Sequence, residues 1–238
     1  MSLLVVALNI RARNRNRINA MGTFVFRRGK IYPIFKRVAE TILSIVLLIL
    51  MAPLFLLLTL AIRWDSPGPA LFRQTRIGKR GKSFTFYKFR TMFHDIDRSG
   101  HQAFLKAYVN GELASGTNGQ NVYKPIQANQ ITRVGRILRK TSLDELPQLF
   151  NIIKGEMSFI GPRPNVPTEV EAYQEWHRKR LEVLPGITGL AQINGRSMIA
   201  FDQIVQYDIE YVENAGLLMD LKVLWCTIPA VLLGNGAK

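Results

Sequence analysis

The feature that most restricts the fold of this 238-residue chain is an apolar segment, Thr41–Ile62, which contains no charged residue in 22 positions. A helix of this length is sufficient to occupy the hydrocarbon core of a bilayer. A core helix of a soluble protein is the alternative, but such helices rarely stay apolar on every side for so long. The segment therefore predicts a membrane-embedded helix.

Pro53 follows Ala52 near the middle of this segment and favours a kink, because proline removes one backbone donor. Each arm beside the proline has about 11 residues, or roughly 16 Å of helix, which is about one leaflet deep. Basic residues flank both ends of the segment, and basic flanks are typical of the cytoplasmic side. The pattern favours a re-entrant helix over 34–63 that bends at Ala52-Pro53. A straight crossing with a short basic arm outside is the alternative.

The charge of the chain points to an anionic partner. Lys and Arg number 32 against 17 Asp and Glu, a net charge of +15, and the pI is about 10.3. Residues 1–38 hold nine of the basic residues and no acidic one, so we interpret 1–33 as a basic N-terminal arm. Because anionic lipid accounts for an excess beside the membrane segment, we expect membrane lipid and no nucleic acid as partner. A membrane-anchored basic nucleic-acid-binding or scaffold protein is the alternative.

The remaining residues, 64–238, are predicted to form a cytoplasmic catalytic domain that is rich in helices and has a small β element, an α+β class. Hydrophobic residues make up 47% of the chain, enough for a core, and the single cysteine, Cys226, excludes a disulfide framework. Residues 83–90 alternate like a strand, with Lys88 and Arg90 on one face. We expect helices over 131–140, 143–154, 166–183 and 201–214, irregular chain over 158–167 and 185–196, and an interfacial amphipathic helix over 217–233.

Two adjacent acids, Asp144 and Glu145, begin the predicted helix over 143–154. Capping explains them without any catalysis: Ser142 and Glu145 match a capping box, and Asp144 also suits an N-cap. The functional interpretation rests on the basic residues that precede them, which with a helix N-terminus suit a bound diphosphate. A carboxylate among cations stays ionised and can act as a nucleophile or a metal ligand. The preceding basic residues are Arg133, Arg136, Arg139 and Lys140.

Three further cations are candidate phosphate ligands. Arg163 lies between Pro162 and Pro164, and this rigid mounting loses little entropy when a phosphate binds. Lys88 and Arg90 could reach the same anion from their strand. An ordinary rigid turn and plain strand-surface charge are the alternatives.

Four motifs in this order resemble the bacterial sugar transferase family, the monotopic phosphoglycosyl transferases. The resemblance extends from about Ile34 to Leu233 and covers the proline-broken helix and three motifs: YKFRTM at 87–92, RKTSLDELPQLFNIIKGEMSFIGPRP at 139–164 and PGITGLAQINGR at 185–196. Each motif alone is weak, but the ordered set is specific.

The resemblance implies a monotopic enzyme of the bacterial inner membrane, with its catalytic domain on the cytoplasmic face. Such enzymes move a sugar 1-phosphate from a UDP-sugar to polyprenyl (undecaprenyl) phosphate, release UMP, and so begin polysaccharide assembly. By resemblance Asp144 is the nucleophile that forms an aspartyl-phosphosugar intermediate, and Glu145 assists. Both would hold Mg2+. The resemblance implies phosphate binding by Arg139 and Arg163, with Lys88 and Arg90 as contributors. The sugar stays unassigned, and a homo-oligomer stays open.

Overall fold

The computed structural model describes residues 31–94, 105–111, 128–195 and 199–232, so nearly all of the predicted basic arm lies outside the described residues. The described chain begins with two helices, α2 (Ile31–Leu50) and α3 (Ala52–Asp65), which meet at an angle of 63°. Pro53 is the second residue of α3 and has no N–H for the preceding turn. The two helices are interrupted at Met51, one residue before the predicted Ala52-Pro53 position.

A hairpin and three short helical elements follow. Strands β1 (Leu71–Ile77) and β2 (Ser83–Phe89) pair antiparallel, with Leu71 opposite Phe89 and Ile77 opposite Ser83. The short 3-10 turns η1 (Lys79–Gly81) and η2 (Ala128–Gln130) lie in the connections. The helical elements are α5 (Arg133–Thr141), η3 (Leu143–Glu145) and α6 (Gln148–Lys154). The predicted strand and the predicted helix over 131–140 are confirmed. The helix expected over 143–154 is divided into η3 and α6.

The second half of the body is built on two short parallel strands, β3 (Ser158–Ile160) and β4 (Gly186–Thr188). The helical elements around them are α7 (Pro167–Glu171), η4 (Glu175–Glu182), α8 (Leu190–Asn194), α9 (Phe201–Asn214) and α10 (Leu217–Leu232). Helices α9 and α10 confirm the prediction, whereas the single helix expected over 166–183 is wrong, because α7 and η4 divide it. The irregular chain expected over 158–167 and 185–196 is also wrong at β3, β4 and α8.

Glycine explains the close pairing of β3 and β4. A Cβ atom on Gly186 would lie 2.1 Å from the backbone nitrogen of Gly161, so no larger residue fits there. The Gly161 N–H donates to the carbonyl of Thr188 at 2.9 Å, and the Gly186 N–H donates to the carbonyl of Pro162 at 2.9 Å. The pairing fixes the start of the Gly-Pro-Arg-Pro segment to the body.

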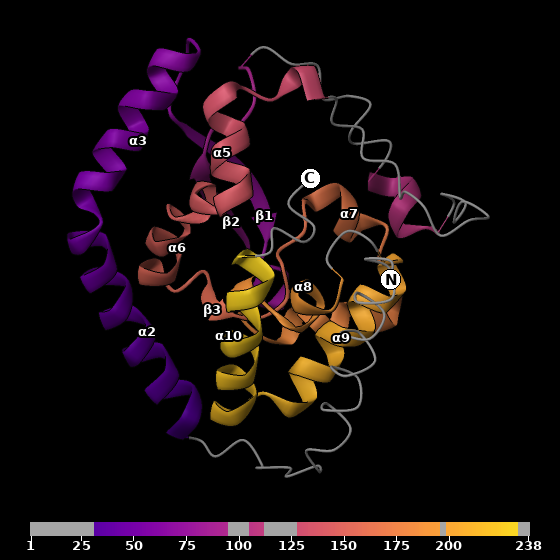
Figure 1. Ribbon diagram of the computed structural model, residues 1–238. Coiled ribbons are helices and arrows are strands. Elements are labelled where there is room, and N and C mark those ends of the chain that lie inside the picture. The colour runs from indigo at the N-terminus through magenta and orange to yellow at the C-terminus, as the bar shows by residue number, and fades with distance from the viewer. Residues whose placement is uncertain (1–30, 95–104, 112–127, 196–198, 233–238) are drawn as a thin grey trace, which may run out of the picture.

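The bent helix pair lies along one side of the body, next to α6 and α5, while α7 and α9 lie on the opposite side (Figure 1). Phe84 and Phe86 of β2 form a core cluster with residues of α6, and Leu47 and Leu48 of α2 pack against it. At the other arm, Ile62 of α3 packs with Phe89 of β2. Both arms of the bent pair therefore contact the same body.

Polar contacts add to this docking of α2. Lys36 forms an ion pair with Asp220 of α10 at 2.7 Å, and Glu40 accepts a hydrogen bond from the Ser158 hydroxyl at 2.8 Å. Arg37 donates to two carbonyls at the end of α6. The first half of α2 is thus held to the body through charged and polar side chains.

The outer face of the bent pair is apolar and exposed. Its large exposed residues are Ile31, Ile34, Phe35, Val38, Ile42, Leu43, Ile45, Val46, Ile49, Leu50, Leu56, Leu57 and Leu60. Within the described ranges no single helix has the length and hydropathy of a transmembrane span, but α2 and α3 taken together do. Helix α10 adds a second exposed apolar face that includes Leu221, Leu224 and Trp225.

Candidate active site

A left-handed residue brings the two candidate acids into position. Ser142 ends α5 with φ 58° and ψ 16°, a conformation that few residues other than glycine adopt. The chain thereby turns into η3, which carries Asp144 and Glu145. Neither Ser142 nor Asp144 forms a side-chain cap, and Pro147 precedes α6 as its N-cap residue. Both capping hypotheses are therefore wrong, and helix capping does not explain the acids.

Asp144 forms an ion pair with Lys88. The Lys88 Nζ donates to Oδ2 of Asp144 at 3.2 Å, and the carboxylate side chain is only 8% exposed. Burial raises the pKa of Asp144 above its ordinary 3.8, the Lys88 ammonium opposes this rise, and Glu145 adds to it. Burial likewise lowers the pKa of Lys88, against the effect of Asp144. Among the described residues, Oδ1 of Asp144 accepts no hydrogen bond, so one oxygen of an ionised carboxylate remains available.

Glu145 forms the second ion pair of the site, with Arg163. The Arg163 guanidinium donates to Oε1 of Glu145 at 2.9 Å, and its side chain is 44% exposed. The Gly-Pro-Arg-Pro segment thus reaches back to η3 over 18 positions of sequence. A guanidinium that is half in solvent can bind an incoming phosphate without first breaking a buried contact.

Arg139 is the third cation near Asp144, after Lys88 and Arg163. Its Nε donates to the Thr91 hydroxyl at 3.0 Å. Gly135 allows α5 to lie this close to the end of β2, because a Cβ atom there would be 2.1 Å from the Thr91 carbonyl oxygen. Burial lowers the pKa of Arg139, and the Asp144 carboxylate opposes this change, so the two groups lie within electrostatic reach. The structure therefore brings together Lys88, Arg139, Asp144, Glu145 and Arg163.

Arg90 does not join this group. It is 5% exposed, and its guanidinium donates to the Ser66 carbonyl at 2.6 Å, the Ser66 hydroxyl at 3.0 Å and the Pro67 carbonyl at 2.5 Å. Strand β2 ends at Phe89, so the alternation that placed Arg90 with Lys88 stops one residue earlier. The phosphate-binding role expected for Arg90 is corrected to a structural one at the end of α3.

Sequence reasoning missed two polar residues next to the site. Arg76 of β1 donates to the Pro164 carbonyl at 2.9 Å and so holds the segment that carries Arg163. Gln148, one turn after Asp144, is fully buried, and its amide has no hydrogen-bond partner among the described residues. An unpaired buried amide costs free energy and is uncommon in a folded protein. In the sequence, the position of Gln148 four residues after Asp144 was the only indication that it lies near the acidic pair.

The acidic pair has the chemistry of a Mg2+ ligand set. Mg2+ in proteins is usually held by one or two carboxylates together with water and substrate phosphates. Asp144 and Glu145 supply two such carboxylates, and within the described ranges no cluster of three or more His, Cys, Asp or Glu residues forms a separate metal site. These two residues therefore have the donor chemistry that Mg2+ prefers.

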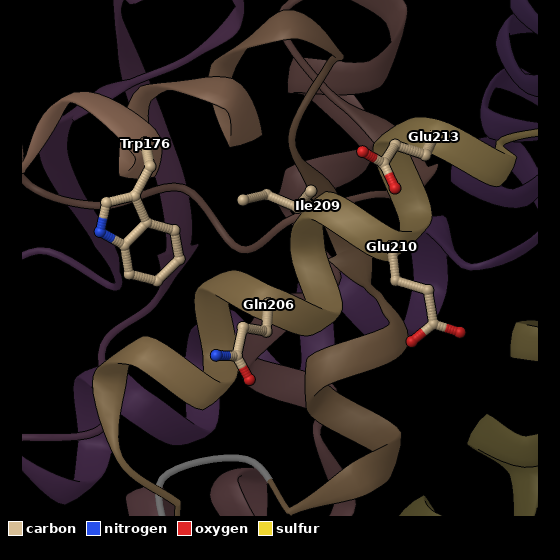
Figure 2. A pocket seen from close by; sticks show the side chains of 5 residues that line it. All are labelled: Trp176, Gln206, Ile209, Glu210 and Glu213. Carbon is tan, nitrogen blue, oxygen red and sulfur yellow. The ribbon is translucent and has the colours of Figure 1, made fainter.

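A separate hollow of about 430 Å³ lies between η4 and α9 (Figure 2). Figure 2 shows Trp176 on one side and three polar side chains of α9 on the other. Two of these, Glu210 and Glu213, are acids. Glu213 is paired with Lys179 at 2.5 Å, and Glu210, which has no ion pair among the described residues, would repel a phosphate. The hollow shares no residue with the Asp144 cluster and does not suit a nucleotide diphosphate.

Comparison with known proteins gives the family. The family model described as Bacterial sugar transferase matches residues 31–234. The exopolysaccharide production protein ExoY of Sinorhizobium fredii is 40% identical over 212 residues, which are 88% of this chain and 92% of that relative. The UDP-glucose:undecaprenyl-phosphate glucose-1-phosphate transferase of Caulobacter vibrioides is 38% identical over 210 residues, 85% of this chain and 71% of the relative.

Some relatives are longer. The galactosyl transferase CpsE of Streptococcus agalactiae is 38% identical over 206 residues, 86% of this chain, but the chain spans only 44% of its length. The match to the family model, residues 31–234, covers α2 to α10 and includes all five residues that the structure brings together. The chain belongs to the bacterial sugar transferase family.

Proposed function

We propose that this protein transfers a sugar 1-phosphate from a UDP-sugar to a polyprenyl phosphate such as undecaprenyl phosphate, and so begins polysaccharide assembly. The observation that carries the proposal is the buried Asp144 carboxylate, 3.2 Å from Lys88 and next to the Glu145–Arg163 ion pair. One relative is named for glucose-1-phosphate transfer from UDP-glucose to undecaprenyl phosphate, which supports the substrate class.

The chemistry has two displacement steps. An oxygen of Asp144 attacks the β-phosphorus of the UDP-sugar, and the bond to the bridging oxygen breaks, so that UMP leaves with the electron pair. An oxygen of polyprenyl phosphate then attacks the same phosphorus and releases Asp144. Arg139 and Arg163 would bind phosphate oxygens, since paired guanidiniums match their geometry and charge. Lys88 would hold the carboxylate ionised and oriented.

Mg2+ held by Asp144 and Glu145 would offset the charge of the diphosphate. Both carboxylates are paired with cations in the structure, so their negative charge is already balanced before substrate binds. A diphosphate that enters between the two pairs adds the charge that a divalent cation would neutralise.

Membrane attachment through α2 and α3 would place this site at the bilayer surface. A water-soluble nucleotide and a lipid phosphate have to meet there, and the exposed apolar faces of the bent pair and α10 are suited to it. We propose a monotopic arrangement with the body on the cytoplasmic face of the bacterial inner membrane.

A screen of UDP-sugars tests this function directly. The full chain in phospholipid vesicles with undecaprenyl phosphate should release UMP from one or a few UDP-sugars. Release should require the lipid acceptor for more than one turnover. No UMP from any common UDP-sugar, with lipid acceptor present and the protein folded, would contradict the proposal.

Removal of divalent cations should abolish UMP release, and added Mg2+ should restore it. The expected loss is large because the diphosphate adds negative charge that neither ion pair neutralises, and this charge repels the acceptor phosphate. The measurement is the initial rate in excess EDTA and after Mg2+ is restored. A rate in EDTA equal to the untreated rate would remove the metal from the proposal.

The dependence of kcat/KM on pH should show the effect of the Lys88 ion pair on the pKa of Asp144. Asp144 attacks only when ionised, so activity falls as the pH falls through its pKa, which burial raises above 3.8. The Lys88 ammonium lowers this pKa, so Lys88→Met should move the acid limb of kcat/KM to higher pH. Lys154→Met removes an exposed lysine that contacts Tyr87 instead, and it should leave the limb in place. An unmoved limb in Lys88→Met would contradict the pairing in solution.

A further inference from the structure

The segment that carries Arg163 is held on its rear side by a buried arginine, Arg180 of η4. The Arg180 Nη2 donates to the backbone carbonyl of Arg163 at 3.1 Å, and its Nη1 donates to Oδ1 of Asn165 at 2.7 Å. These contacts lie on either side of Pro164. The side chain of Arg163 extends to Glu145 in η3, while its own carbonyl is bound to the body behind it.

Arg180 is itself fixed by two partners. It is 3% exposed, and its guanidinium forms an ion pair with Asp208 of α9 at 2.5 Å. It also donates to the Tyr173 hydroxyl at 2.7 Å. Asp208 is 1% exposed, so both charges of this pair are removed from solvent. Separating the two residues would leave a buried charge uncompensated, which costs free energy, so the pair stays together.

The geometry uses the planar fork of arginine. One guanidinium donates hydrogen bonds to a backbone carbonyl, a side-chain amide oxygen and a phenol oxygen, and it also forms the ion pair with Asp208. The single ammonium of lysine cannot reproduce this planar arrangement. Pro162 and Pro164 lock φ on both sides of Arg163, and Pro164 also restricts the backbone of Arg163 itself, so the segment has little conformational freedom. A displacement at the carbonyl of Arg163 is therefore passed on to its side chain.

We propose that Arg180, held by Asp208, is a positioning residue that fixes the backbone of residues 163–165 and so aims the Arg163 guanidinium at the donor diphosphate. The inference rests on the proposed function only for the identity of that ligand. Neither Arg180 nor Asp208 touches the substrate. They act on the reaction through Arg163 alone. The proposal is therefore tested by whether the effects of Arg180 and Arg163 substitutions on kcat/KM are coupled.

A double-mutant cycle measures this coupling on the full chain in vesicles. Arg180→Lys keeps the charge and loses the fork, and it should lower kcat/KM for the UDP-sugar by about 10- to 100-fold, because a misplaced binding group is costly. Arg163→Gln should cause a comparable or larger loss. The double variant should match Arg163→Gln within about twofold. The Arg180–Asp208 pair, called the brace below, then has no Arg163 guanidinium to position, so its loss has no further effect. Losses that multiply in the double variant would overturn the proposal.

Two further variants separate the proposed effect from misfolding and from a nonspecific loss of activity. Asp208→Asn disturbs the same brace from α9 and should show the same coupling to Arg163, so it replaces Arg180→Lys if that variant does not fold. Arg178→Gln is the matched control, because Arg178 is an exposed arginine two positions away whose ion pair among the described residues is with Glu175, at 4.0 Å. Its kcat/KM should equal that of the unmodified protein.

Backbone hydrogen exchange separates this inference from the proposed function. In Arg180→Lys and Asp208→Asn, the amides of Gly161, Arg163 and Asn165 should exchange faster than in the unmodified protein. The Ile77 amide, which donates to the Asn165 carbonyl at 2.9 Å, should also exchange faster, while the amides of β2 should not change. If no UDP-sugar is turned over but this local exchange increases, the function fails and the brace stands. Unchanged exchange at 161–165 in both variants would overturn the brace, whatever the activity.

Discussion

Asp144→Asn is expected to abolish UMP release, with a loss of at least about 10³-fold in kcat, because removal of a covalent nucleophile leaves only binding and electrostatic effects. The substitution should preserve the fold. Asp144 caps no helix, and among the described residues its side chain accepts a hydrogen bond from Lys88, which an amide oxygen can also accept. Mass analysis of the unmodified protein, quenched with UDP-sugar and without lipid acceptor, should find a phosphosugar adduct on Asp144.

Asp202→Asn is the matched control, because Asp202 is an acid of α9 whose side chain is 59% exposed. It should retain UMP release near the unmodified level. Full activity of Asp144→Asn would remove Asp144 as the nucleophile. An adduct on another residue would have the same consequence, even if Asp144→Asn were inactive.

The broken apolar helix and the acidic pair could be predicted from local sequence because each is a local property. A run of 22 uncharged residues with one proline specifies a broken helix, and the break lies where Pro53 removes a donor. The adjacent acids lie together in any fold. Their capping interpretation failed because Ser142 adopts the left-handed conformation, which spacing alone does not reveal.

The rest of the site depends on contacts between distant parts of the chain. Strand β3 has only three residues and pairs with β4 some 28 positions later, so neither shows a periodic pattern. Arg90 was misassigned because the strand ends one residue before it, where its guanidinium turns to Ser66. Arg180 looks like any cation of a polar helix, and only the fold places its guanidinium behind Arg163.

A label at the start of α2 and a label in the turn between β1 and β2, which follow the bent helix pair, should react from the same side of the membrane. Cys226→Ser removes the native cysteine, and single cysteines then replace Ile31, which is 79% exposed, and Lys82, which is exposed after η1. Both should be modified by a membrane-impermeant maleimide only from the cytoplasmic side. A cysteine at Met51, at the bend, should react from neither side.

The packing of the two arms is the physical reason for this expectation. Helix α2 contacts α6, helix α3 contacts α5, and both α5 and α6 pack against the same hairpin. The polar contacts of Lys36 and Glu40 with the body would have to break, or the body would have to enter the hydrocarbon, if α2 and α3 crossed as one straight helix. Either event costs several kcal/mol for each unpaired polar group. Opposite accessibility of the labels at residues 31 and 82 would therefore contradict both the re-entrant arrangement and the docking of α2 on the body.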